Sequence, residues 1–160
     1  MKRLPYLLMV LLVLACSSVD CPVNSLVETK YEVYGSDGET LKLTDTLTVI
    51  SIRADDSLTV LNSLTGASSF HLPISYSHPE DILYFVFHNR KDSLFVVDTV
   101  CIKKDDYPHF ESVDCNASFF HTLTDVRYTK NYIDSLVIKN PSVTYDSETV
   151  HFYLYPKSGD

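Results

Sequence analysis

Residues 82–88, ILYFVFH, and residues 94–102, LFVVDTVCI, are the most apolar segments beyond the amino-terminal sixteen residues. Four residues, Asn89–Asp92, separate them, which is a length typical of a β-hairpin loop. Because apolar residues occupy both faces of each segment, we expect a hairpin at the centre of a sheet. Strand alternation places Asp98 toward solvent near the strand end and Cys101, three positions on, toward the core.

Further strands are expected on both sides of this hairpin. Residues 27–33 and 150–155 alternate apolar and polar side chains, and residues 110–113, 119–124 and 133–139 are weaker candidates. The Gly35–Gly38 segment predicts a plain turn, because its acids lack the ligand spacing of a calcium loop. No segment after residue 24 sustains helical spacing. The sequence predicts an all-β fold, an immunoglobulin-like antiparallel β-sandwich over residues 24–156, with 157–160 as a tail.

The amino-terminal residues have the features of a cleaved signal peptide. A basic pair, Lys2 and Arg3, precedes an apolar run that ends at Leu14 and is followed by Ala15 and Cys16. The run is shorter than the ~20 apolar residues of a membrane-spanning helix. The segment resembles the lipobox of bacterial lipoproteins, which implies cleavage after residue 15 and acylation of Cys16. Residues 16–23 then form a polar tether.

Composition and motifs exclude several classes of function. The formal net charge is −8 and there is no basic cluster, so nucleic acid is not an expected partner. Glycine-rich phosphate loops and a Gly-x-Ser-x-Gly elbow are absent, and no cofactor is expected. The six histidines show no metal-ligand spacing and are expected on the surface or at strand ends. Cys115 with His109 or His121 nearby could act as a thiol nucleophile and its base, but no recognisable motif surrounds them.

An Asp-Ser/Thr-apolar phrase recurs along the chain. It begins at Asp45, Asp56, Asp92, Asp98 and Asp134. In four cases, all but Asp98, we expect it to mark a turn that leads into a strand, because these side chains hydrogen-bond nearby backbone. The phrase also resembles the O-glycosylation signal of secreted Bacteroides-type proteins. That resemblance implies acceptors at Thr46, Ser57, Ser93 and Ser135, of which Ser57 and Ser93 are favoured; Thr99 is expected to point inward and stay unmodified.

The carboxy-terminal half carries a further resemblance. Residues 108–115 (PHFESVDC), 120–121 and 133–141 (IDSLVIKNP) resemble a family of small lipoproteins of Bacteroides-type bacteria whose function is uncharacterised. The family's usual pair of cysteines matches Cys21 and Cys115. The resemblance therefore implies a Cys21–Cys115 disulfide, with Cys101 buried and free. A Cys101–Cys115 bridge across one loop is the alternative.

Three functions are compatible with these features. The first is a non-enzymatic module that binds or positions a protein or glycan partner while a lipid anchors it to the outer membrane. The second is a subunit of an adhesin or pilus, and the third is an envelope hydrolase with converging carboxylates or a Ser–His pair. Ser17 after Cys16 and a single acid before Cys21 favour the periplasmic face of the membrane over the cell surface.

Overall fold

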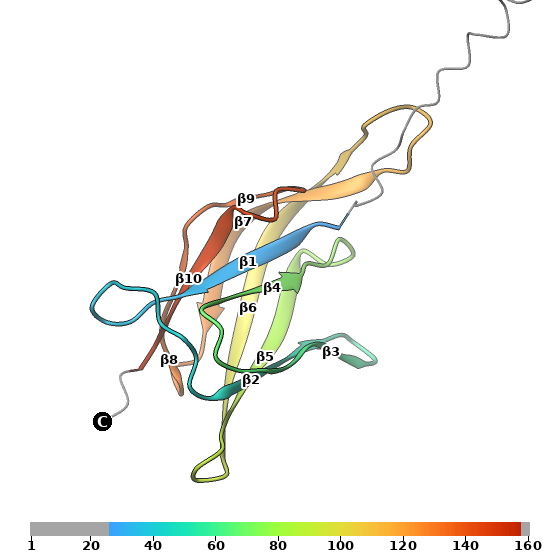
Figure 1. Cartoon of the computed structure of the whole chain (residues 1–160). Helices are drawn as coiled ribbons and strands as arrows, with labels where there is room; N and C mark the ends of the chain where they lie inside the picture. Colours follow the sequence, from blue (N-terminus) through green and yellow to red (C-terminus); the bar gives the residue numbers. More distant parts are fainter. Residues whose placement is uncertain (1–25, 158–160) are drawn as a thin grey trace, which may run out of the picture.

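The computed structural model describes residues 26–157, which form ten β-strands and no helix (Figure 1). The strands are β1 (Glu28–Val33), β2 (Thr46–Ile52), β3 (Ser57–Leu64), β4 (Ser69–Pro73), β5 (Glu80–Asn89), β6 (Leu94–His109), β7 (Ser118–Tyr128), β8 (Ile133–Ile138), β9 (Ser142–Val143) and β10 (Val150–Pro156). They form a four-stranded sheet, in the order β4-β1-β10-β8, and a six-stranded sheet, in the order β3-β2-β5-β6-β7-β9. The predicted all-β sandwich is confirmed. Only β1 and β10 pair in parallel within the described chain.

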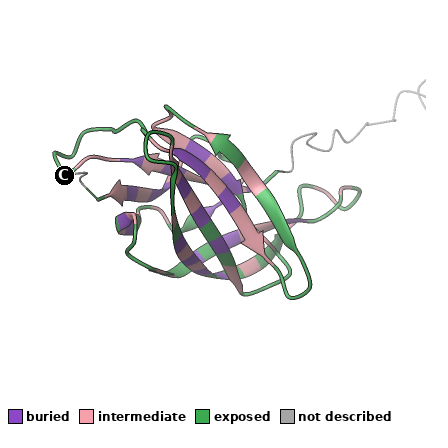
Figure 2. Cartoon of the chain, turned by 90° about the horizontal axis from the view of Figure 1, so that it is seen from below, coloured by how far each residue is buried: buried purple, intermediate pink, exposed green. Residues whose placement is uncertain are grey.

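The core lies between the two sheets, and buried residues alternate with exposed ones along most strands (Figure 2). Tyr31 of β1 lies at its centre. Its ring stacks on Phe70 and Phe152, with centroids 4.9 and 4.7 Å away, and meets the edge of Phe85 from the other sheet at 6.0 Å. Aromatic contacts therefore join both sheets through one side chain.

The predicted hairpin forms the centre of the larger sheet. β5 and β6 pair from Glu80 with Lys103 to Asn89 with Leu94, and β2 and β7 flank them. The outer face of the pair carries Ile82 and Tyr84, each exposed by more than a third. The expectation of two apolar faces is therefore confirmed.

The predicted orientation of β6 is wrong. Asp98 is fully buried, whereas Cys101 is half-buried on the outer face, opposite Ile82 of β5. Thr99, expected to point inward, shares that outer face. The alternation along β6 places Asp98, Val100 and Ile102 in the core. The buried carboxylate is tolerated because it accepts four hydrogen bonds from residues that lead into β8.

Two other boundaries differ from the prediction. Residues 110–113 belong to the loop between β6 and β7, since β6 continues through Pro108 to His109. β5 pairs with β6 only as far as Lys103, so Pro108 lies where β6 has β7 as its one neighbour. A proline is tolerated where a strand lacks a second partner. The phrase at Asp134 lies inside β8 rather than in a turn before it.

Candidate functional site

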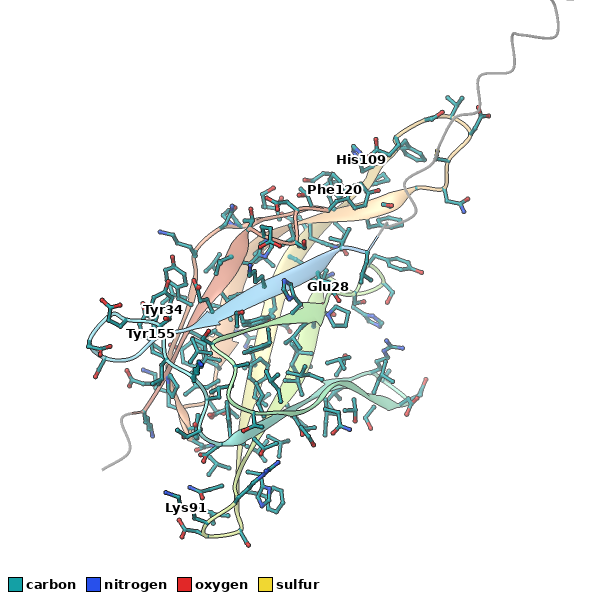
Figure 3. All side chains as sticks on the ribbon, viewed as in Figure 1. Glu28, Tyr34, Lys91, His109, Phe120 and Tyr155 are labelled. Atoms are coloured by element: carbon teal, nitrogen blue, oxygen red, sulfur yellow. The ribbon has the colours of Figure 1, made fainter. Side chains whose placement is uncertain are left out.

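Three tyrosines form an aromatic platform on the outer face of the four-stranded sheet. Tyr153 and Tyr155 point outward because Phe152 and Leu154, their neighbours along β10, are buried in the core. Tyr34 follows β1, and its ring centroid lies 4.6 Å from that of Tyr153 and 5.9 Å from that of Tyr155. Figure 3 shows Tyr34 and Tyr155 side by side. We call these three residues the tyrosine platform.

Charged side chains border the tyrosine platform. The Tyr34 hydroxyl donates a hydrogen bond to Glu32 Oε2 at 2.9 Å, and this carboxylate raises the pKa of Tyr34 above its ordinary value. Lys139 Nζ lies 5.4 Å from the centroid of the Tyr153 ring, within cation–π distance. The hydroxyls of the platform are therefore accompanied by one carboxylate and one ammonium group.

An open groove lies between the β1–β2 loop and the end of β10. It has a volume of about 480 Å³ and is lined by residues 35–37 and 39–45, Asn89, Tyr132, Pro156 and Lys157. The loop turns at Gly35–Gly38, as predicted. Gly38 has a φ of 81°, and Gly35 N donates to Glu39 O at 2.8 Å to close the turn.

The groove joins the tyrosine platform through a second hollow. This hollow, of about 660 Å³, is lined by Tyr155, Asp134 and Ser135, and it shares Ser36, Pro156 and Lys157 with the groove. Tyr155 therefore belongs to both the platform and the hollow. We call the groove and the hollow together the distal groove.

Polar and charged side chains line the distal groove together with apolar groups. Asp37, Asp45 and Asp134 contribute carboxylates, whereas Lys157 Nζ donates to Lys130 O at 2.7 Å. Tyr132 is stacked on Phe87 at 3.7 Å, and burial, reinforced by the nearby Asp45 carboxylate, raises its pKa to about 12. The Tyr132 hydroxyl thus keeps its proton at neutral pH and donates a hydrogen bond to the Asp45 carboxylate.

A buried polar cluster lies at the other end of β6. Lys104, whose side chain is inaccessible to solvent, donates to both oxygens of Asp106 at 3.0 Å and to His78 O at 2.6 Å. Asp106 Oδ1 also lies 2.6 Å from His121 Nδ1. Burial lowers the pKa of His121, which favours a neutral ring that donates from Nδ1 to Asp106. Burial likewise raises the pKa of the neighbouring Asp81.

Hydrogen bonds within the cluster satisfy its ammonium group, although Lys104 and Asp106 also line an open hollow of about 310 Å³. The three Lys104 hydrogen bonds use every proton of its ammonium group. His121 lines a cavity of about 260 Å³ with apolar neighbours, among them Leu26, Tyr76 and Phe119. Sequence reasoning missed the His121–Asp106 pair because the two residues lie on different strands, and they meet only through the β6–β7 register.

The histidines do not gather into a metal site. Among residues 26–157 no group of three or more His, Cys, Asp or Glu is placed to hold an ion. His109 Nε2 lies 3.0 Å from Glu111 Oε1, and the His109 ring stacks on that of Phe120 with centroids 4.2 Å apart. Figure 3 shows His109 and Phe120 close together. His121 and His151 are only 1% exposed, so neither is a surface residue. His151 does lie near the start of β10, whereas His121 lies within β7, and the expectation of a surface or strand-end position is wrong for His121.

The structure decides part of the cysteine pairing. Cys101 is a free thiol and Cys115 is disulfide-bonded, so the alternative Cys101–Cys115 bridge is wrong. A bonded Cys115 also cannot act as a thiol nucleophile. Cys16 and Cys21 lie outside the described residues, and acylation of Cys16 and the pairing of Cys21 with Cys115 stay predictions. Residues 26–157 contain no helix long and apolar enough to cross a membrane.

The predicted glycosylation acceptors differ in accessibility. Ser57 and Ser93 are exposed, Ser135 is half-buried within the distal groove, and Thr46 is buried.

Comparison with known proteins finds no match among curated proteins and none among solved structures. One protein family does match, over residues 46–156, which include β2 to β10 and the sequence of the central hairpin. The matched residues contain all of the six-stranded sheet and most of the distal groove outside the β1–β2 loop. The chain therefore belongs to a family of unknown function, DUF6452.

Proposed function

We propose that this protein is a lipid-anchored, non-enzymatic module of the bacterial envelope that binds a glycan in the distal groove. The observation that carries the glycan proposal is the continuity of the tyrosine platform and the distal groove through Tyr155. Sugar rings present apolar C–H faces, which pack on aromatic rings, and hydroxyls, which need donors and acceptors beside those rings. The platform and the groove supply both.

The polar groups of the distal groove suit a neutral or cationic sugar chain. The Asp37, Asp45 and Asp134 carboxylates are acceptors for sugar hydroxyls, and the Lys42 ammonium group is a donor. The negative charge of these carboxylates opposes a polyanionic ligand such as a phosphate-rich polymer. We therefore expect an uncharged or amino-sugar segment to be preferred.

The cellular address in this proposal comes from the amino-terminal sequence. Acylation of Cys16 would anchor the domain in the outer membrane of a Bacteroides-type bacterium, facing the periplasm rather than the cell surface. The alternatives of an adhesin or pilus subunit and of an envelope hydrolase remain. The Lys104–Asp106–His121 cluster, in which every Lys104 donor is already used, gives the hydrolase less support than the open groove gives a binding module.

The proposal is tested with the secreted chain carrying Cys16→Ser, screened against an array of bacterial envelope glycans and titrated by calorimetry. Tyr155→Ala should weaken binding about tenfold, or ~1.4 kcal/mol. The matched control is Tyr84→Ala, which removes an exposed tyrosine from the outer face of the other sheet. Equal effects of the two substitutions, or no glycan binding by the parent chain, would contradict the proposal.

A further inference from the structure

Exposed apolar side chains gather at the end of the sandwich where the described chain begins. Leu26, Tyr76 and Tyr107 are exposed there, and the β6–β7 loop adds Phe110 and Val113, which are 62% and 98% exposed. We call these five residues the apolar tip. In Figure 1 the β6–β7 loop projects from the end at which β1 starts.

Hydrogen-bonded strands and ring contacts hold the apolar tip together. The Tyr76 ring stacks on Phe119 at 4.8 Å, and Phe119 is the β7 partner of Pro108 in β6. Leu26 lines the same cavity as Tyr76 and Phe119. The beginning of the described chain, the segment before β5 and the β6–β7 loop therefore meet at one end.

The length of β6 separates the apolar tip from the β5–β6 turn. β6 contains 16 residues, which at ~3.3 Å per residue place its two ends about 50 Å apart. Lys91 lies in the turn at the far end, well away from His109 in Figure 3. That far end also exposes Leu94 and Phe95, so apolar exposure alone does not decide which end meets a membrane.

The chain before Leu26 decides between the two ends. Ten residues, 16–25, join the proposed lipid anchor to Leu26 and span about 35 Å at most when fully extended. Cys115 lies in the β6–β7 loop, two residues after Val113. If Cys21 is its partner, the tether is tied to this loop and the anchor reaches about 20 Å from it.

We propose that the apolar tip contacts the surface of the bilayer that holds the lipid anchor, which leaves the distal groove pointing away from the membrane. This inference rests on the lipid anchor of the proposed function. Tyrosine favours the interface between headgroups and acyl chains, and exposed phenylalanine and leucine can bury at the same boundary. Glu111 and Asp114 in the same loop oppose deep insertion and anionic headgroups, so the contact is shallow and suits zwitterionic lipid.

An artificial tether is used to test the membrane contact, so that the test does not depend on acylation of Cys16. The chain from residue 16 carries Cys101→Ser and a hexahistidine in place of Cys16, and it binds nickel-chelating lipids in phosphatidylcholine vesicles. An environment-sensitive fluorophore is attached at Val113→Cys or, as the control, at Lys91→Cys. Emission should shift to the blue and be quenched by brominated lipids at position 113 alone. Equal responses at the two positions, or a response only at 91, would overturn the inference.

Side-chain substitutions provide the second measurement. Phe110→Ser should at least halve the quenching at position 113, whereas Leu94→Ser at the far end should leave it unchanged, with circular dichroism confirming the fold of each variant. If Phe110→Ser has no effect, the apolar tip is not the contact. Failure of the anchor is recognised separately, by the mass of the native amino terminus and by retention of Cys16→Ser in the membrane fraction.

Discussion

The Asp98 carboxylate accepts a hydrogen bond from the backbone amide of Ile133 at 2.8 Å, and both residues are fully buried. The oxygen that accepts this bond, Oδ2, also accepts a hydrogen bond from Tyr132 N at 2.7 Å. The other oxygen accepts from Asn131 N at 2.7 Å and from the Thr129 hydroxyl at 2.6 Å. One side chain of the six-stranded sheet thus fixes the segment that crosses to β8 in the four-stranded sheet.

Removal of the Asp98 carboxylate should strongly destabilise the fold. In Asp98→Ala three backbone N–H groups and a hydroxyl lose a charged acceptor, and we expect the free energy of unfolding to fall by about 3 kcal/mol or more. Urea denaturation measures the change. Asp105→Ala, on the exposed face of β6, is the control and should stay within about 0.5 kcal/mol of the parent. Equal midpoints for the two variants would show that the network contributes little.

The contrast between the central hairpin and Asp98 shows what the sequence could predict. Residues 82–88 and 94–102 are adjacent and continuously apolar, so a local pattern was enough to identify the centre of the sheet. The orientation of β6 depended on hydrogen-bond donors more than thirty residues away. On polarity alone Asp98 was expected to face solvent, because the hydrogen-bond donors that offset the cost of burying its carboxylate are not visible in a local pattern.

The tyrosine platform and the distal groove were also beyond prediction. Tyr34 and Tyr155 lie near opposite ends of the described chain, and they meet because β1 and β10 pair in parallel. A parallel pairing of two distant strands leaves no signal in either segment. The turn at Gly35–Gly38 was predictable from its glycines, but its place beside Tyr132 and Lys157 was not.

His151 should make the protein less stable in mild acid. It is 1% exposed; Nδ1 accepts from Lys30 N at 3.0 Å, and Nε2 donates to Ser142 O at 3.1 Å. A second ring proton would oppose the Lys30 N–H, and burial lowers the pKa of His151. The unfolded chain therefore binds a proton near pH 6.5 while the folded chain resists it, and stability should fall as the pH decreases below 6.5.

Urea denaturation between pH 7.5 and 5.0 measures this dependence. His151→Gln should be less stable than the parent at pH 7.5 but should show a shallower decline toward acid. Asp81 acts in the opposite direction, because burial raises its pKa and makes the folded state favour the proton. Asp81→Asn should therefore steepen the decline. Parallel curves for His151→Gln and the parent would reject the assignment.

The thiols should differ sharply in reactivity. Cys101 is free and half-buried on the outer face of β6, whereas Cys115 is disulfide-bonded. In the chain carrying Cys16→Ser and without reductant, iodoacetamide should modify Cys101 alone; after reduction under denaturing conditions it should also modify Cys21 and Cys115. Peptide mapping without reduction should recover Cys21 linked to Cys115. Cys101→Ser should leave that linked peptide unchanged, and a linked peptide containing Cys101 would contradict the assignment.

The Asp-Ser/Thr phrase should carry glycans only where the hydroxyl is accessible. Ser57 begins the edge strand β3, and Ser93 lies in the β5–β6 turn with a φ of 52°; both are exposed. Thr46 is buried, and its hydroxyl has no hydrogen-bond partner within the described chain.

A transferase that acts on the folded chain can reach the exposed hydroxyls but not that of Thr46. Intact-mass measurement on protein from its native host should show which of these residues carry a glycan. Ser57→Ala and Ser93→Ala should each remove one glycan mass. Thr46→Val should change the mass only by the difference between the two side chains. The variant should be as stable as the parent or slightly more stable, because the substitution removes an unsatisfied buried hydroxyl. A mature mass explained by polypeptide and lipid alone would leave the phrase as turn and strand chemistry.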